Sequence, residues 1–147
     1  MSDPSAVQRP VLAASIAVFR DGKVLLAQRG KAPGLGLYSL PGGRIEPGET
    51  MREGALRELL EEVGLEAEIL AFIDHVEHIE RADDGVIRAH AVVAAFVGVW
   101  RGGEAILTDE ASDVLWVDPL EPGDLPMTRG LPAILARAAH LVAGALP

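Results

Sequence analysis

The apolar positions of the chain follow two periods, one typical of strands and one typical of helices. Residues 11–19 and 23–28 are apolar and partly β-branched, and the Asp-Gly pair at 21–22 is a strong hairpin signal. Residues 65–79 and 86–100 form two longer β-rich stretches. A sheet rich in strands is therefore predicted, and the apolar end of the last stretch is expected to be a buried central strand.

One helix is predicted with both of its ends marked. Thr50 is a favourable N-cap, Glu53 completes a capping box, and Gly64 follows the last helical turn. At about 100° per residue, one side of this helix is apolar and the other is almost purely acidic. The apolar side comprises Met51, Ala55, Leu56, Leu59, Leu60 and Val63, and the acidic side carries Gly54, Glu58, Glu61 and Glu62.

The rest of the chain is predicted as connections, a short strand and a closing helix. Residues 30–36 form a glycine-rich loop, and the adjacent glycines at 42–43 are expected to be another break. Residues 113–117 are typical of a short strand stopped by a proline. Apolar residues then recur at helical spacing over 131–142, which predicts an amphipathic helix packed on the sheet.

Composition and charge limit the class of protein. The chain has 147 residues, of which 49% are hydrophobic and 24% charged, as expected for one globular domain. We predict a single α/β domain over 1–147, with a mixed sheet, about two helices and a flexible N-terminus at 1–10. Cysteine is absent, which excludes disulfides and thiolate metal sites, and the net charge of -9 opposes a general nucleic-acid binder. No secretory signal or membrane-length apolar run is visible, so a cytoplasmic location is expected.

The acidic residues are concentrated around the predicted helix. Eight glutamates and only two arginines lie between residues 46 and 68. Residues three and four apart share a helix face, so Glu58, Glu61 and Glu62 repel one another there. Such a cluster is either a solvated face or a site for a hard divalent cation such as magnesium, which prefers carboxylate oxygens. Arg57, four residues before Glu61, can hold one carboxylate without occupying the cation position.

These glutamates belong to a longer pattern. Gly43 is followed after five residues by Glu49, and after seven more by the run from Arg57 to Leu65. The string meets every fixed position of Gx5Ex7REUxEExGU, where U is an apolar aliphatic residue, and a chance match at one start is on the order of one in 10⁸ or rarer. The chain therefore resembles the Nudix hydrolase superfamily, especially its small bacterial MutT-like and ADP-ribose pyrophosphatase-like members.

The resemblance implies a fold and a reaction. The fold is an α/β/α sandwich with a mixed sheet and a catalytic loop–helix–loop. The reaction is Mg²⁺-dependent hydrolysis, with Mn²⁺ as a substitute, of the pyrophosphate bond in a nucleoside diphosphate linked to a moiety X. It implies a small nucleotide-derived substrate, no stable nucleic-acid or membrane partner, and a homodimer.

The resemblance also assigns roles inside the motif. The residues that match metal ligands are Gly43 through its carbonyl, Glu58, Glu61 and Glu62, and Glu61 matches either a third ligand or the general base. Glu49 and Arg57 match the pair that ties the loop to the helix, which is a structural role in the catalytic site. Which carboxylate acts as the base is left open by the resemblance.

Four residues that are not fixed positions of the motif are further candidates. Some family members supply another glutamate about six residues before a tryptophan, and Glu110 lies six residues before Trp116. Glu104 is the fallback, and a solvated loop acid is the alternative for both. Arg29 and Arg44 match basic residues that touch phosphate in triphosphate-cleaving relatives, and arginine suits phosphate because its planar fork bonds two oxygens.

The substrate is less constrained than the reaction. ADP-ribose or a related nucleotide sugar is slightly favoured, and a nucleoside triphosphate, including an oxidised dNTP, is the alternative. A non-catalytic Nudix domain that senses a nucleotide is the competing class. The intact motif favours the enzyme.

Two weaker features lie outside this pattern. His75 and His78, with Glu77, have the residue types of a zinc site, but strand residues three apart point to opposite faces, so a shared metal is not expected. The aromatic residues that could stack on a base, with a place in the core as the alternative, are Tyr38, Phe72 and Trp100.

Overall fold

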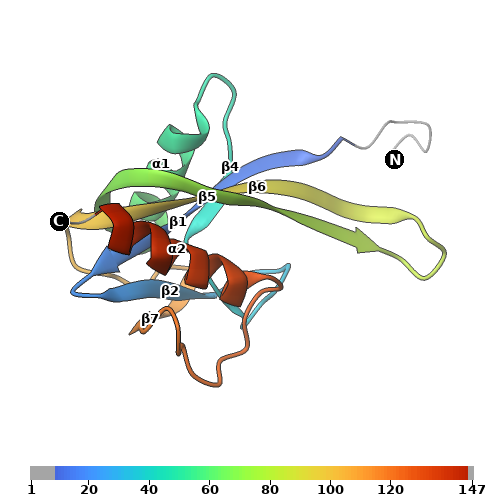
Figure 1. Cartoon of the computed structure of the whole chain (residues 1–147). Helices are drawn as coiled ribbons and strands as arrows, with labels where there is room; N and C mark the ends of the chain where they lie inside the picture. The colour runs from blue at the N-terminus through green and yellow to red at the C-terminus, as the bar shows by residue number, and fades with distance from the viewer. Residues whose placement is uncertain (1–8, 146–147) are drawn as a thin grey trace.

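The computed structural model describes residues 9–145 as a mixed α/β fold (Figure 1). Residues 1–8 of the predicted flexible N-terminus lie outside this part. The elements in chain order are β1 (Val11–Arg20), β2 (Lys23–Arg29), β3 (Tyr38–Ser39), β4 (Gly42–Arg44), α1 (Met51–Val63), β5 (Glu66–Arg81), β6 (Ile87–Gly102), β7 (Ala111–Val117) and α2 (Leu131–Ala145). Within the described residues, neither helix has the length and apolar character that crossing a bilayer requires.

The strands form one mixed sheet. Its order is β3-β2-β1-β6-β5, with β4 paired to β1 and β7 paired to β2. The predicted hairpin is confirmed, because β1 and β2 pair antiparallel around Asp21 and Gly22, whose φ values of 52° and 79° suit a tight two-residue turn. The predicted central strand is confirmed as well, since β6 lies between β1 and β5 and is buried over residues 94–98.

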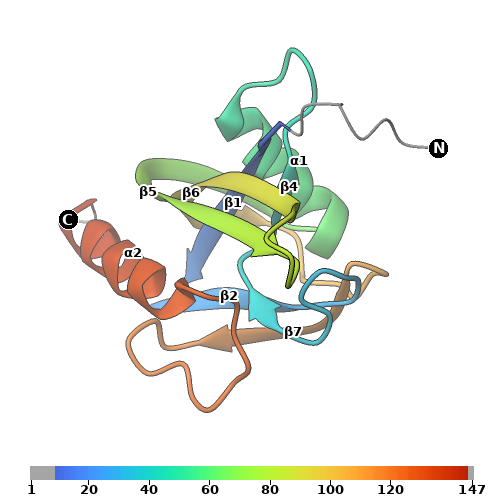
Figure 2. The ribbon, with the colours of Figure 1, turned by 90° about the vertical axis from the view of Figure 1, so that its right-hand side faces the viewer.

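The two helices cover opposite faces of the sheet (Figure 2), which confirms the α/β/α sandwich. Successive side chains of a strand point to opposite faces, so β1 and β6 contribute to both layers of the core. Ile16 and Phe96 pack in the layer with α1, whereas Ala17 and Val97 pack in the layer with α2. The candidate chemistry lies at one end of the α1 layer.

Helix α1 begins and ends where the sequence predicts. The Thr50 hydroxyl accepts the Glu53 N–H at 3.1 Å, and the Glu53 carboxylate accepts the Thr50 N–H at 3.1 Å, which completes the capping box. Gly64 has a φ of 74° and donates its N–H to the carbonyl oxygen of Leu60. Thus, local signals alone define the length of this helix.

The buried face of α1 differs from the predicted one. Leu60 is 52% exposed, so its assignment to the apolar side was wrong. The fully buried positions include Gly54 and Leu59, and the side chain of Glu58 is only 12% exposed. The helix is rotated so that part of its acidic face turns toward the sheet, and Leu60 is turned toward solvent.

A second correction concerns the paired glycines at 42–43, which form strand β4 instead of a break. They pair antiparallel with Ala14 and Ser15 of β1. A Cβ on Gly42 would lie 2.4 Å from the carbonyl oxygen of Ala14, so only glycine permits this close approach. Glycine pairs usually mark turns, and nothing in the local sequence separates the two cases.

The rotation of α1 predicts unequal costs for two neighbouring leucines. Leu59→Ala removes a fully buried side chain and is expected to lower the free energy of unfolding by about 2–5 kcal/mol. Leu60→Ala is the matched control on the same helix and is expected to cost less than about 1 kcal/mol. Urea denaturation followed by circular dichroism measures both, and equal losses would contradict the described orientation.

Candidate active site

Three carboxylates from two parts of the chain meet at one point. Glu58 and Glu62 lie four residues apart on α1, and Glu110 comes from the loop before β7. One carboxylate oxygen from each lies within 4.8 Å of the others. Glu104, the fallback candidate, lies elsewhere, 79% exposed and paired with Arg20 at 3.2 Å.

The backbone around Glu110 holds it against the helix. The Gly30 N–H donates to the Glu110 carbonyl at 3.0 Å, and a Cβ on Gly30 would lie 2.2 Å from the carbonyl oxygen of Asp109. The Thr108 hydroxyl donates to the Glu62 carbonyl at 2.7 Å. The loop before β7 is therefore tied both to the end of β2 and to the end of α1.

Arg57 joins the approach loop to the acidic helix. Its Nε and Nη2 atoms donate to the two oxygens of Glu49 at 2.7 and 2.9 Å, and Nη2 also donates to the Arg44 carbonyl at 2.9 Å. Its Nη1 atom donates to Glu58 at 3.0 Å and to Glu61 at 3.1 Å. These bonds lower the pKa of Glu49 to about 2 and raise the pKa of Arg57, so both groups keep their charges.

Glycines make room for the carboxylates. The Gly42 N–H donates to Glu62 at 3.2 Å, and a Cβ on Gly43 would lie 2.6 Å from the Glu58 carboxyl carbon. A Cβ on Gly54 would lie 2.4 Å from Ile45 and 2.9 Å from Glu49. This crowding accounts for a glycine in mid-helix, where its helix propensity is unfavourable.

The carboxylate cluster carries a large electrostatic cost when it is fully ionised. Burial, together with the charges of Glu58 and Glu110, holds the pKa of Glu62 well above the usual range. Burial also raises the pKa of Glu58, although Arg57 acts in the opposite direction. Three close carboxylate oxygens fit a hard divalent cation, whose positive charge compensates their negative charge. Glu61 is not one of the three and is 59% exposed beside Arg57.

Cationic side chains line the same pocket as the carboxylates. The pocket has a volume of about 350 Å³ and includes Arg29, Lys31 and Arg44 in its lining. The Arg29 Nε donates to the Pro33 carbonyl at 2.6 Å, which anchors the guanidinium group at the end of this side chain. Sequence reasoning missed Lys31, and its only available signal was a position two residues after Arg29 in a glycine-rich loop.

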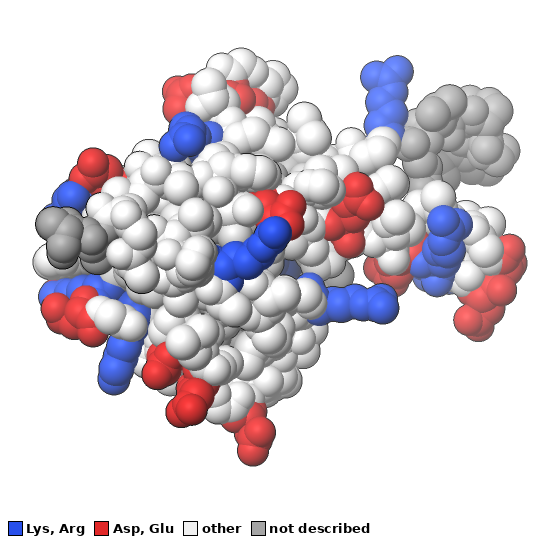
Figure 3. Space-filling view, in the orientation of Figure 1, with Lys and Arg blue, Asp and Glu red and all other residues white. Residues whose placement is uncertain are grey.

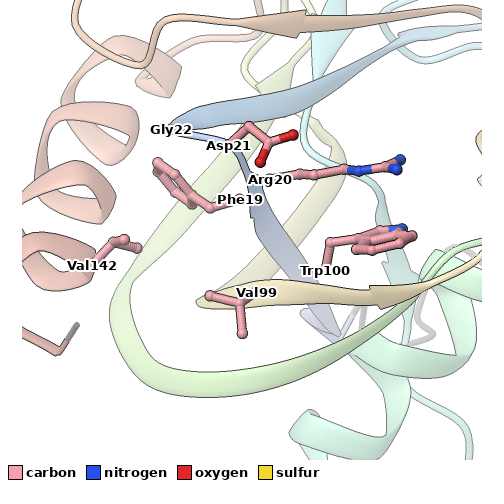
Figure 4. Close-up of a pocket in the computed structure, with 7 residues that line it drawn as sticks. All are labelled: Phe19, Arg20, Asp21, Gly22, Val99, Trp100 and Val142. Carbon is pink, nitrogen blue, oxygen red and sulfur yellow. The ribbon is translucent and has the colours of Figure 1, made fainter. Parts of the chain in front are cut away.

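A second pocket, of about 270 Å³, lies away from the carboxylates (Figure 4). There the Arg20 guanidinium lies over the Trp100 ring, 3.8 Å from its centre. Trp100 is therefore not placed to stack on a ligand of the carboxylate pocket. Of the other two aromatic candidates, Tyr38 is buried and donates its hydroxyl to Asp113 at 2.5 Å. Phe72 makes an edge contact with Phe96 and is 49% exposed.

Comparison with known proteins agrees with this geometry. The NUDIX domain profile matches residues 9–138. The chain is 35% identical over 123 residues to the CTP pyrophosphohydrolase of Escherichia coli K12. The alignment covers 81% of this chain and 89% of that protein. A crystal structure of a MutT NUDIX hydrolase from Burkholderia pseudomallei matches with a TM-score of 0.77 at 28% identity, over 88% of this chain and 98% of that chain.

A third likeness comes from a structure with a bound nucleotide. The NUDIX domain of Shewanella oneidensis NrtR, solved with ADP ribose, matches with a TM-score of 0.72 at 25% identity, over 96% of this chain and 94% of that chain. The family profile, the relative and the two structures all extend well beyond the 43–65 motif, and they establish that the chain belongs to the Nudix hydrolase family.

Proposed function

We propose that this Nudix hydrolase is a magnesium-dependent pyrophosphohydrolase that converts a nucleoside triphosphate to a nucleoside monophosphate and pyrophosphate. The observation that carries the proposal is the pocket of about 350 Å³ whose lining includes the three carboxylates together with Arg29, Lys31 and Arg44. Three cations suit a triphosphate better than a diphosphate. The E. coli relative, which is named for CTP, supports the same preference, whereas the sequence's resemblance to small bacterial family members slightly favours ADP-ribose.

Glu58, Glu62 and Glu110, with the carbonyl of Gly43, would hold the metal. Magnesium, when bound there, supplies positive charge to the phosphates and lowers the pKa of the attacking water. The half-burial of Glu58 and Glu62 strengthens their interaction with a cation relative to a solvent-exposed cluster. The chain's net charge of -9 also makes a cation between protein and phosphate necessary for close approach.

The remaining side chains bind phosphate and accept a proton. Arg29, Lys31 and Arg44 would bind phosphate oxygens and orient the chain of phosphates across the carboxylates. The water oxygen forms a bond to one phosphorus, and the bond from that phosphorus to the bridging oxygen breaks, so the two products leave as phosphates. The water proton passes to a carboxylate, for which Glu61 is the candidate, because it is not among the three that would hold the metal.

ADP-ribose is the second candidate substrate. The NrtR domain of similar fold was solved with ADP ribose, and the chain's resemblance to small bacterial family members slightly favours that substrate class. Hydrolysis would then release AMP and ribose phosphate. The predicted cytoplasmic location and the predicted homodimer remain predictions, and a light-scattering mass near 15.5 kDa would contradict the dimer.

A substrate panel tests the proposed reaction. With about 5 mM magnesium, a level suited to weakly held Mg²⁺, CTP, dGTP and oxidised dGTP are expected to give pyrophosphate and the monophosphate. AMP from ADP-ribose without turnover of triphosphates would favour the second candidate instead. Binding of these nucleotides without any product would overturn the enzyme proposal and support a sensing domain.

The two loop glutamates give a matched pair of variants. Glu110→Gln is expected to lower kcat at least about 10²-fold, because it removes one of the carboxylates that hold the metal. Glu104→Gln, which alters only an exposed ion pair, is expected to change kcat by no more than about twofold. Steady-state kinetics with saturating magnesium measures both, and equal effects would refute the assignment of Glu110.

Glu62→Gln tests the electrostatic cost of the cluster in the absence of metal. The raised pKa of Glu62 means that the folded protein binds this proton more tightly than the unfolded chain. This contribution to stability is complete below about pH 4.3 and declines as the pH rises through the folded pKa. In EDTA at pH 8, we expect Glu62→Gln to be more stable than the parent by about 1 kcal/mol or more.

Magnesium should reverse the relative stability of the parent and Glu62→Gln. Millimolar Mg²⁺ is expected to raise the Tm of the parent and to have little effect on Glu62→Gln, because only the parent gains a cation that binds the folded state. Turnover of Glu62→Gln should fall at least about 10²-fold. Parallel pH profiles in urea denaturation, with equal magnesium responses, would rule out Glu62 as a ligand.

A further inference from the structure

Glu110, the carboxylate that does not come from α1, lies in a tight turn over residues 108–111. The Ala111 N–H donates to the Thr108 carbonyl at 3.2 Å, and the Thr108 N–H donates to the Ala111 carbonyl at 3.0 Å. Asp109 and Glu110 are the two central residues of this turn, and both are exposed. The position of Glu110 therefore depends on how the two ends of the turn are held.

The two ends of the turn are held in different ways. Ala111 is fully buried in the core layer that contains α1, so packing fixes this end. Thr108 is only half-buried, and Ile106 and Leu107 before it are 54% and 63% exposed. Packing is weak there, and the Thr108 end depends on hydrogen bonds.

Two hydrogen bonds join the segment before the turn to the last turn of α1. The Ile106 N–H donates to the Val63 carbonyl at 3.0 Å, and the Thr108 hydroxyl donates to the Glu62 carbonyl at 2.7 Å. The last carbonyls of a helix lack an N–H partner within the helix, so they can accept bonds from a neighbouring segment. The Thr108 hydroxyl thus bonds the backbone of Glu62, which carries another of the three carboxylates.

The same hydroxyl also acts inside the turn. It accepts the Ala111 N–H at 3.3 Å, so one oxygen atom joins the turn to the helix. A serine at this position keeps both the donor and the acceptor, whereas a valine keeps the shape and has neither. Without the hydroxyl, the Glu62 carbonyl loses its partner and the turn loses its side-chain bond to α1.

The carboxylates need such a restraint because they repel one another. Acidic and basic side chains are interspersed over the face of the molecule in Figure 3, whereas three carboxylate oxygens converge within 4.8 Å at the site. Like charges at this separation favour movement of the exposed turn away from the helix. We propose that Thr108 is a positioning residue that holds the Glu110 carboxylate against α1 and thereby sets the affinity of the cluster for magnesium.

This inference rests on the metal-binding role that the proposed function gives the cluster, and magnesium binding without substrate tests it. Thermal melts over a magnesium series give the concentration at which Tm begins to rise, and melts in EDTA report whether each variant is folded. Thr108→Val is expected to need about tenfold more magnesium, as when a group that orients a metal ligand is removed. Thr108→Ser should respond like the parent.

A matched control comes from the residue after the turn. The Ser112 hydroxyl donates to Gln28 Oε1 at 3.2 Å and not to α1. Ser112→Ala therefore also loses a hydroxyl bond, but it is expected to keep the magnesium response of the parent. In kinetics, Thr108→Val should raise the half-saturating magnesium concentration by the same factor, and excess magnesium should restore most of kcat.

A double-mutant cycle separates positioning of Glu110 from a general structural role. If Thr108 acts through Glu110, adding Thr108→Val to Glu110→Gln leaves the magnesium response of Glu110→Gln unchanged. If Thr108 only stabilises the fold, the substitution shifts the response by the same factor in both backgrounds, and the inference is overturned. Thr108→Ala, which also lacks the hydroxyl, replaces the valine variant if that variant does not fold.

The outcomes separate this inference from the proposed function. A parent-like magnesium response of Thr108→Val, or a serine variant as weak as the valine variant, overturns the inference even when the parent hydrolyses triphosphates. Loss of folding in both the valine and alanine variants makes Thr108 a structural residue and also overturns it. If the magnesium response depends on Thr108 but no substrate is hydrolysed, the proposed reaction fails and the inference stands. A parent whose Tm does not respond to magnesium overturns both.

Discussion

The close approach of three carboxylates is the constraint on which the candidate site depends. Oxygens of Glu58, Glu62 and Glu110 lie within 4.8 Å of one another in a half-desolvated place, where their repulsion exceeds that in water. Each is restrained by a different neighbour: Arg57 donates to Glu58, a backbone N–H donates to Glu62, and the loop of Glu110 is tied to β2. Residues that never touch a substrate are therefore necessary, because they hold together charges that would otherwise separate.

The restraint relies on close approaches at glycines, made by backbone atoms at Gly30 and Gly42 and by side chains at Gly43 and Gly54. Gly30, Gly42, Gly43 and Gly54 each occupy a position where a Cβ would lie under 3.0 Å from another atom. Only Gly43 is a fixed position of the motif, and the other three bring the segments around it into contact. A segment before α1 and a loop almost 50 residues after it thus reach the same helix face. The motif is local in sequence, whereas the site that it serves is assembled by packing.

The elements with strong local signals were predictable, and those that depend on tertiary pairing were not. The β1–β2 hairpin and the ends of α1 follow from turn and capping residues. The glycine strand β4 and the exposure of Leu60 depend on how α1 is rotated against β1, which helical periodicity does not determine. Sequence spacing placed Glu110 among the candidates, but its meeting with Glu58 depends on loop contacts. Glu61 was grouped with Glu58 because both share a helix face, although only one of them turns toward β4.

The reaction and the choice of substrate depend on different parts of the fold. The motif and the glycines around it shape the part of the site proposed to bind the phosphates of the substrate. A relative named for CTP and a domain solved with ADP ribose nevertheless both resemble this chain. Selection among such ligands must then depend on residues outside the motif. The β5 strand has register shifts at four points, and one of them lies between Phe72 and Asp74. Because a bulge changes which side chains point to a given side of the sheet, the residues that β5 presents on each side are set by backbone irregularities instead of by the motif.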